Sequence, residues 1–365
     1  MFLAWKEMKH NRLKYSIITL VLVAVMYLVF FTIGLSRGIK NFGASKIINS
    51  SAQTFVLSEG VSDRLERSSM SSRRALEIKE QMGEDATIIG VTLANMTNVS
   101  SDSSDSFGVA YFAVETDTFL SPTLIEGRAP KDDREVIATP YIRNYGVDLG
   151  DKIHDSRMDV SFTIVGFAED ETYNYSPIVY LQPEQYSEVT FIGQMTGSSN
   201  VQSVVTMSSP SEVASDITKY NIDLSTKEKI IETTPGLAQQ SASFTLLIAS
   251  MYIISGMILA MFFYIVTIQK RKEFGQLKAF GADNRFIIGA VLGQVGIVTL
   301  VGIMVSTILI LLTDAVLPPI IPFLLQWRYI VWGSLLFLGV AILGSLASVY
   351  ETIKIDPIEA VGGNN

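Results

Sequence analysis

Four long apolar runs interrupt an otherwise polar chain. They cover residues 16–35, 244–268, 286–312 and 329–349, and none of them contains a charged residue. A helix needs about 20 residues to cross a bilayer core about 30 Å thick. Because a backbone in hydrocarbon must satisfy its own hydrogen bonds, each run is predicted to form a membrane-spanning helix.

The first run has one alternative interpretation, a cleaved signal peptide, because Lys6, Lys9, Arg12 and Lys14 precede it. The run is longer than the usual apolar core of such a peptide, about 7–15 residues, and no clear cleavage motif follows it. We therefore expect a retained anchor. Residues 1–15 are expected to form a cytoplasmic amphipathic helix at the membrane interface, with a plain extension of the first span as the alternative.

The polar stretch between the first two runs, residues 36–243, is predicted to be an α+β domain. Short segments rich in β-branched residues are separated by turn residues, which is typical of strands, and the stretch is long enough to bury its own core. The Ser/Asp-rich loop 100–106 precedes an expected smaller inserted β-rich lobe at about 107–160. The predicted strands are 53–57, 87–93, 109–114, 135–139, 160–166, 177–181 and 203–207, and the predicted helices are 71–82 and 211–220.

The distribution of basic residues predicts the orientation in the membrane. Lysine and arginine concentrate before the first run and in residues 269–285, whereas the loop 313–328 carries only Arg328. By the positive-inside rule, both termini, including the tail 350–365, and the segment 269–285 are cytoplasmic. Residues 36–243 then lie outside. They include 29 acidic and 17 basic residues, which gives no support for nucleic-acid binding.

The chain carries little of the chemistry that an enzyme needs. It has no cysteine, which excludes a disulfide framework and a thiolate metal site. The two histidines, His10 and His154, are predicted on opposite sides of the membrane and cannot share a metal or a catalytic site. The phosphate-binding motif G-x-x-x-x-G-K-[ST] is absent from the sequence. We therefore expect no catalytic residue, no metal and no stably bound cofactor, and any step driven by ATP would need a separate subunit.

The segment after the second run has an apolar pattern of its own. Phe274, Leu277 and Phe280 recur every three residues, which predicts a short helix with one apolar face, and Gly281 suits a helix end. A basic stretch flanking a membrane helix is the simpler alternative, but it explains only Lys270–Lys272. A short amphipathic helix in a cytoplasmic loop indicates a docking site for a partner protein.

Three motifs resemble those of the MacB/FtsX-like (type VII) ABC transporter permeases. Residues 271–281, Arg-Lys-Glu-Phe-Gly-Gln-Leu-Lys-Ala-Phe-Gly, resemble the signature R-E-I-G-I-L-K-A-I-G, and Asp356-Pro-Ile-Glu-Ala360 resembles a terminal D-P-x-E-A motif. The third is Glu126-Gly-Arg128, followed by Glu135-Val-Ile-Ala-Thr-Pro140 and Leu149-Gly-Asp151. Within the family, the chain is most similar to the HrtB-type haem exporter permeases of Gram-positive bacteria.

The resemblance implies a MacB-like membrane α-helical fold: four transmembrane helices, with a large extracytoplasmic α+β domain between helices 1 and 2. It further implies a homodimer in the plasma membrane of a Gram-positive bacterium, in contact with membrane lipid. Two copies of a cytoplasmic ABC ATPase subunit would drive it by mechanotransmission. The residues carried over as ATPase contacts are Glu273, Phe274, Gly275, Leu277, Lys278, Ala279 and Gly281. Gln276 departs from the apolar residue usual at its position.

A haem substrate is expected near the outer ends of the first two spans, where two copies would form a cleft. Aromatic side chains can cover its flat apolar body, Arg37 or Lys40 can pair with its propionates, and Met or Tyr can ligate iron. Routine packing in an aromatic belt is the alternative. The candidates are Tyr27, Phe31, Arg37, Lys40, Phe42, Gln239, Phe244, Met251, Tyr252 and, in the outer domain, Tyr173. Export of antimicrobial peptides or other lipophilic toxins, and an FtsX-like signal transducer that moves no substrate, are the alternative functions.

Overall fold

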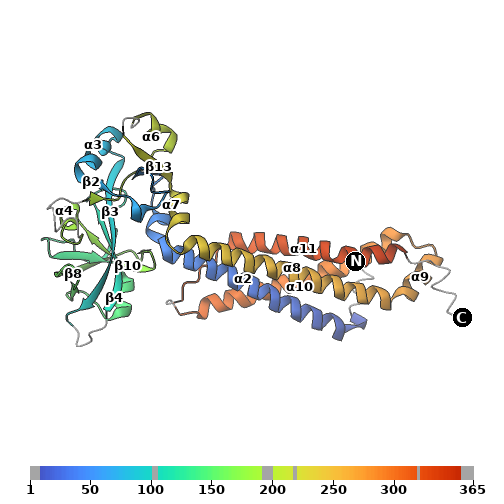
Figure 1. Cartoon of the computed structure of the whole chain (residues 1–365). Coiled ribbons are helices and arrows are strands. Elements are labelled where there is room, and N and C mark those ends of the chain that lie inside the picture. Colours follow the sequence, from blue (N-terminus) through green and yellow to red (C-terminus); the bar gives the residue numbers. More distant parts are fainter. Residues whose placement is uncertain (1–8, 101–105, 191–199, 217–219, 319–320, 355–365) are drawn as a thin grey trace. The chain divides into compact units, whose positions relative to one another are not determined.

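The computed structural model describes residues 9–100, 106–190, 200–216, 220–318 and 321–354. The chain divides into two compact units (Figure 1). The helical unit combines residues 1–39 and 241–365, and the sheet domain is residues 40–240. Most of the predicted amphipathic helix, and the motif Asp356–Ala360, lie outside the described residues.

The helical unit is built from four long helices, which confirms the predicted number of membrane spans. All four are long and apolar enough to cross a bilayer. Each extends beyond its apolar run, because helical hydrogen bonding continues through polar residues while hydropathy marks only the part suited to hydrocarbon. The helices are α2 (Arg12–Asn49), α8 (Leu237–Gln269), α10 (Asn284–Val316) and α11 (Trp327–Lys354).

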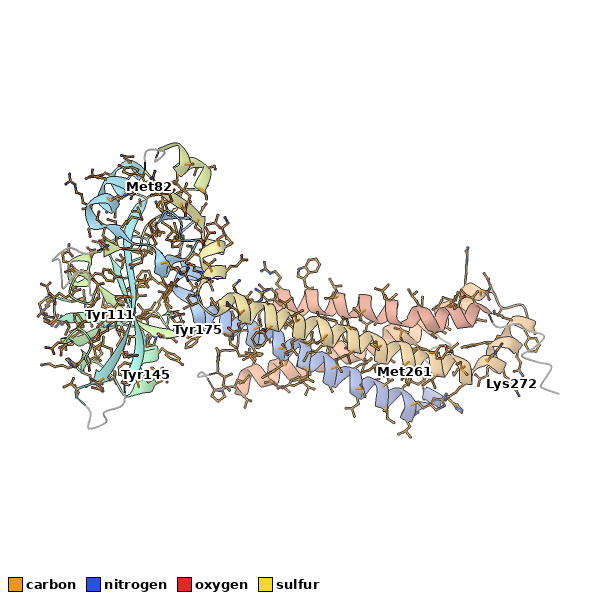
Figure 2. All side chains as sticks on the ribbon, in the orientation of Figure 1. Met82, Tyr111, Tyr145, Tyr175, Met261 and Lys272 are labelled. Atoms are coloured by element: carbon orange, nitrogen blue, oxygen red, sulfur yellow. The ribbon has the colours of Figure 1, made fainter. Side chains whose placement is uncertain are left out.

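Close packing holds these helices together. Leu22, Phe263 and Phe337 are almost completely buried in one apolar cluster. A Cβ atom placed on Gly344 of α11 would lie 2.6 Å from the carbonyl oxygen of Gly256 on α8, so the backbones approach at a distance that only glycine permits. Met261 points away from the helices (Figure 2) and is 68% exposed, as expected for a side chain that faces lipid.

The sheet domain contains every strand that the sequence predicted, together with shorter ones that it did not. The missed strands have four residues or fewer, apart from the one at 222–226, and short segments carry too little alternation to be recognised. The strands are β1 (Thr54–Ser58), β2 (Met70–Ser71), β3 (Ala86–Asn98), β4 (Ser106–Val114), β5 (Leu124–Gly127), β6 (Glu135–Ala138), β7 (Lys152–Asp155), β8 (Val160–Ala168), β9 (Thr172–Tyr173), β10 (Ser176–Leu181), β11 (Asn200–Val201), β12 (Ser203–Thr206) and β13 (Ile222–Thr226). The helices are α3 (Ser72–Met82), α4 (Pro183–Tyr186), α6 (Pro210–Asp216) and α7 (Lys227–Thr233).

One large mixed sheet organises this domain, in the order β13-β1-β12-β3-β4-β10-β6-β8-β5. Six of its strands close into a ring, because β7 pairs with β8 on one side and returns to β3 on the other. The ring encloses an apolar cluster that includes Tyr111 and Phe162. The predicted lobe at 107–160 supplies only part of the ring, since β3, β10 and nearly all of β8 lie outside it, and its boundary stays a prediction.

The family-like motif in residues 126–151 makes several backbone and side-chain contacts in this part of the sheet domain. Gly127 has φ +81°, and a Cβ atom there would lie 2.4 Å from the carbonyl oxygen of Val165, so the turn after β5 requires glycine. The Arg128 guanidinium pairs with the Glu135 carboxylate at the start of β6. The amide of Gly150 donates to the carbonyl of Ile164, 2.8 Å away. The motif residues from 126 to 151 therefore have a structural role in the sheet domain.

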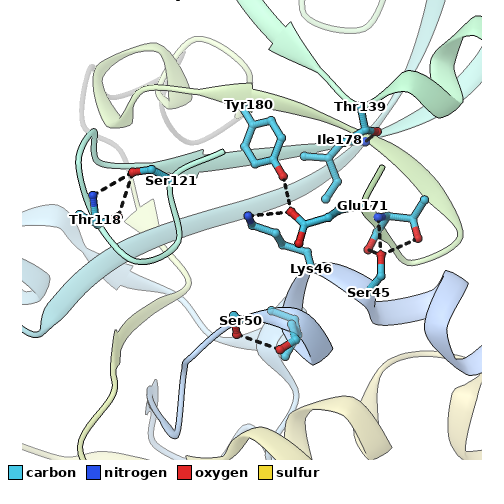
Figure 3. A network of polar contacts seen from close by, with 11 residues as sticks. Ser45, Lys46, Ser50, Thr118, Ser121, Thr139, Glu171, Ile178 and Tyr180 are labelled. Atoms are coloured by element: carbon cyan, nitrogen blue, oxygen red, sulfur yellow. Dashed lines mark hydrogen bonds and ion pairs between the residues drawn. The ribbon is translucent and has the colours of Figure 1, made fainter. Parts of the chain in front are cut away.

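Buried polar contacts bind the last turn of α2 to the strands of the sheet domain (Figure 3). Helical geometry breaks at Ala44, with φ −153° and ψ 30°. Directly after it, Ser45 Oγ accepts a hydrogen bond from the Thr172 amide at 2.6 Å, and Lys46 Nζ donates to Glu171 Oε2 at 2.9 Å. These contacts therefore fix this segment of α2 to the sheet domain.

Candidate functional site

A short helix, α9 (Arg271–Ala279), occupies the predicted coupling segment of the helical unit. Two hydrogen bonds define its end: the amide of Ala282 donates to Leu277 O at 3.0 Å, and the amide of Gly281 donates to Lys278 O at 2.9 Å. This is a Schellman motif, which places its penultimate residue in the left-handed region. Gly281 has φ +87°, so glycine at this motif position ends the helix without strain.

The predicted apolar face of α9 is divided between two environments. Phe274 is 2% exposed and packs against Ile287 and Val291 of α10. Phe280, only six residues later, is 90% exposed. One aromatic ring therefore fastens α9 to α10, while the other is presented to the surroundings.

The remaining predicted ATPase contacts lie around the rest of α9. Lys278 Nζ donates to the carbonyl of Ile353 near the end of α11, at 3.0 Å, which ties α9 to a second membrane helix. Figure 2 places the exposed Lys272 at this end of the helical unit. Of the predicted contacts, Glu273, Ala279 and Gly281 are exposed, Leu277 and Lys278 are half-buried, and Phe274 and Gly275 are buried.

An apolar cavity of about 540 Å³ lies at the end of α10 remote from α9. Leu309, Leu312 and Val316 of α10 and Tyr27 of α2 are among the residues that line it. The Tyr27 hydroxyl shares a hydrogen bond of 3.1 Å with Thr313 Oγ1. The cavity thus combines apolar walls with a single phenol and its hydroxyl partner.

Aromatic contacts extend from this cavity along α2. The Tyr27 ring stacks on Phe31, with centroids 6.3 Å apart, and Phe31 stacks on Phe323 at 5.6 Å. Further along, the Arg37 guanidinium lies over the ring of Tyr329, 4.0 Å from its centroid. The structure therefore gathers three of the predicted substrate residues, Tyr27, Phe31 and Arg37, along one helix.

Two candidates on α8 have packing roles in this structure. The Thr32 hydroxyl donates to the sulfur of Met251 across the α2–α8 contact, at 3.9 Å. The Tyr252 hydroxyl donates to the carbonyl of Gly333 at 3.0 Å, and the residue is 6% exposed. Met251 stays half-buried, as does Phe244 at the start of the second apolar run.

The other candidates belong to the sheet domain. The Phe42 ring lies 4.8 Å from Tyr141, between centroids. Tyr173 is fully buried in the core and its hydroxyl donates to Glu66. Burial, and after it the Glu66 carboxylate, raises the pKa of Tyr173 well above its usual value, so the phenol stays protonated. Lys40 is half-buried and Gln239 is exposed.

Three residues of these sites were missed as candidates: Phe280, Phe323 and Tyr329. Phe280 was recognised as part of the apolar pattern, but its exposure was not predicted. Which apolar side chain of α9 becomes buried depends on where α10 lies. Phe323 and Tyr329 follow the proline-rich turn after the third span, and their aromatic character was the only available signal. Their pairing with Phe31 and Arg37 joins segments nearly 300 residues apart in the chain.

Comparisons with known proteins agree with this arrangement. A family model described as the FtsX-like permease C-terminal domain matches residues 245–357. A protein of Staphylococcus haemolyticus is 25% identical over 368 residues, and one of Staphylococcus epidermidis is 27% identical over 371 residues. Each alignment covers 100% of this chain and 99% of the relative. The extracellular domain of the ABC-type transporter YknZ overlaps 45% of this chain and 87% of its own at 12% identity, with a TM-score of 0.31.

Residues 245–357 therefore match the FtsX-like permease family, and the similarity along the whole chain supports an ABC transporter permease. It is a multi-pass membrane protein with a large domain outside the membrane. Within that class it is similar along its whole length to the two staphylococcal proteins, whose names provisionally assign them to a hemin transport system as its permease, HrtB.

Proposed function

We propose that this permease exports haem, as a homodimer driven by two copies of a separate cytoplasmic ATPase. The observation that carries the proposal is the similarity to the hemin permeases, which extends through the outer domain and all four membrane helices. A similarity limited to the ATPase-coupling region would support a permease of any substrate. Here it includes the segments that line the candidate cavity.

The chemistry of the cavity supports a flat amphipathic substrate. Its volume falls within the usual range for small-molecule sites, about 300–1,000 Å³, and its walls are apolar. The phenol of Tyr27 is a ligand type that haem iron accepts. Arg37, ten residues further along α2, carries a positive charge that can pair with a propionate. In this proposal Tyr27, Phe31 and Arg37 form the substrate path, and Met251 flanks it.

The coupling part of the proposal rests on α9. A helix that transmits force needs one side fixed to the membrane helices and another available to the ATPase. Phe274 and Lys278 fix α9 to α10 and α11, and Glu273, Ala279 and Phe280 are exposed beside them. Closure of the ATPase subunits on ATP would push α9 and, through it, the membrane helices.

The test is haem tolerance in a deletion strain of the host bacterium that carries variants of this chain. Tyr27→Ala should lose the tolerance that the parental chain restores. Tyr264→Ala is the matched control, because Tyr264 is a 40% exposed tyrosine of α8 that does not line the cavity. Equal growth of deletion and parent on graded haem would overturn haem export. Sensitivity of the deletion strain to peptide antibiotics instead would support the alternative substrate class.

A further inference from the structure

A second cavity, of about 650 Å³, lies between α2 and α10 in the helical unit. At one end it is lined by Lys9, three residues before α2, and by Arg12 and Tyr15 in the first turn of α2. Beyond them its walls are apolar, with Leu20 on α2 and Val301 and Val305 on α10. The cavity is therefore amphipathic along its length, with two cations at one end and branched aliphatic side chains further along.

The two cations are available to a ligand. Both side chains are exposed, and the Arg12 Nε donates to the carbonyl of Lys9 at 3.0 Å, which orients the guanidinium while leaving its terminal nitrogens unused by that bond. Among the described residues, neither cation forms an ion pair. Lys14, on the same helix, differs because its Nζ donates to Gln269 Oε1 at 2.8 Å.

The position of this end in the membrane identifies the ligand chemistry. Basic residues concentrate at the start of α2 and around α9, which places this end of the helical unit on the cytoplasmic side. The cytoplasmic leaflet is rich in anionic lipids, and basic pockets between membrane helices on that side bind their headgroups. A lipid combines a phosphate with an acyl chain, and the cavity combines cations with an apolar wall.

We propose that this cavity binds an anionic phospholipid of the cytoplasmic leaflet. The phosphate pairs with Lys9 and Arg12, and one acyl chain lies along Leu20, Val301 and Val305. The site is independent of the proposed haem transport, because it uses neither the cavity at Tyr27 nor the exposed face of α9. A bound lipid would bridge α2 and α10 and hold them in one arrangement.

The experiment measures thermal stability of the purified full-length chain in detergent during titration with phosphatidylglycerol or with phosphatidylcholine of the same acyl chains. Phosphatidylglycerol should give a saturable upward shift of the melting temperature, and phosphatidylcholine a much smaller one. Each cation near an anionic headgroup contributes about a factor of five in affinity. Lys9→Gln with Arg12→Gln should therefore weaken phosphatidylglycerol binding by about 25-fold.

The matched control is the double variant Lys14→Gln and Lys272→Gln, which removes the same charge from the same side of the protein but lines no part of the cavity. It should bind phosphatidylglycerol like the parent. Val305→Phe fills the apolar part and should also weaken binding, although both cations are kept. Addition of glycerol phosphate without acyl chains should give no shift.

Four outcomes would overturn the proposal. The first is equal stabilisation by the two lipids, and the second is equal loss of binding in the test and control variants. Full stabilisation by glycerol phosphate alone would identify a site for free phosphate. Unchanged lipid binding with a loss of self-association in the Lys9/Arg12 variant, measured by light scattering, would show that a second copy of the chain covers the cavity.

Discussion

The ammonium of Lys46 lies 2.9 Å from the Glu171 carboxylate, and their side chains are only 6% and 11% exposed. The Tyr180 hydroxyl donates to the same carboxylate oxygen at 2.9 Å (Figure 3). Burial, and after it the Glu171 charge, raises the pKa of Tyr180 well above its usual value, which keeps this hydroxyl a donor. The pair joins the last turn of α2 to the segment before β9.

Lys46→Met should lower the free energy of unfolding of the sheet domain by about 3–5 kcal/mol, because it leaves the Glu171 charge buried without its partner. Adding Glu171→Gln should recover much of that loss. Denaturant unfolding of the full chain would measure both. If the loss of stability in the double variant equals the sum of the losses measured for Lys46→Met and Glu171→Gln separately, the two residues are not energetically coupled. The exposed pair Arg73–Glu77 is the control, where Arg73→Met should cost less than about 0.5 kcal/mol.

Gly344→Ala should separate α8 and α11 and destabilise the helical unit by about 1–3 kcal/mol, because its methyl group would lie 2.6 Å from the Gly256 carbonyl. Gly339→Ala, on the same helix, meets open space and should be neutral or stabilising by up to about 1 kcal/mol. Thermal melting of the two purified variants would compare them. Similar melting temperatures would show that the close approach has no energetic importance.

Phe280→Ala should impair binding of the ATPase subunit, whereas Phe274→Ala should impair the stability of α9. Phe280 is exposed, so its loss should weaken co-purification of the ATPase subunit while the melting temperature stays unchanged. Phe274 is packed between α9 and α10, so its loss should cost about 3 kcal/mol locally and expose α9 to proteolysis. If Phe280→Ala retained parental ATPase binding, the exposed ring would have no part in docking.

The stability of the sheet domain should depend on Glu135 at acidic pH. The hydrogen bonds from Arg128, and after them the amide of Lys131, lower the pKa of Glu135 to about 2 from its usual 4.5. A lowered pKa means that the ionised carboxylate stabilises the fold above pH 4.5, and that this contribution disappears as the pH falls through 2. Unfolding midpoints measured from pH 6 to pH 2 should decline less steeply in Glu135→Gln. Parallel curves for variant and parent would show that the pair does not contribute.

Much of this architecture could be predicted because it depends on local properties of the chain. An apolar run such as 286–312 must become a helix in hydrocarbon whatever surrounds it. Segments such as 109–114 are buried strands dense in apolar residues, and they are recognisable one by one. The end of α9 at Gly281 is also local, since its hydrogen bonds join residues five or fewer positions apart.

The candidate site depended on contacts that no local pattern contains. The spacing of Gly289 and Gly293 is typical of close helix packing, yet a Cβ atom on Gly289 meets open space, whereas one on Gly344 would lie 2.6 Å from the carbonyl oxygen of Gly256. Spacing indicates that a glycine can pack closely, but the partner helix decides whether it does.

The sequence by itself determined the four membrane helices, their orientation and seven strands of the outer domain, because hydropathy, charge and alternation act within a few residues. Only the tertiary structure decided which ring of α9 is buried and how β7 closes the strand ring. It also decided that Tyr27 contacts Thr313 of α10, that Phe31 stacks on Phe323 in the following turn, and that Arg37 lies over Tyr329 of α11. These outcomes depend on long-range packing, where the free energy of a side chain is set by neighbours distant in the chain.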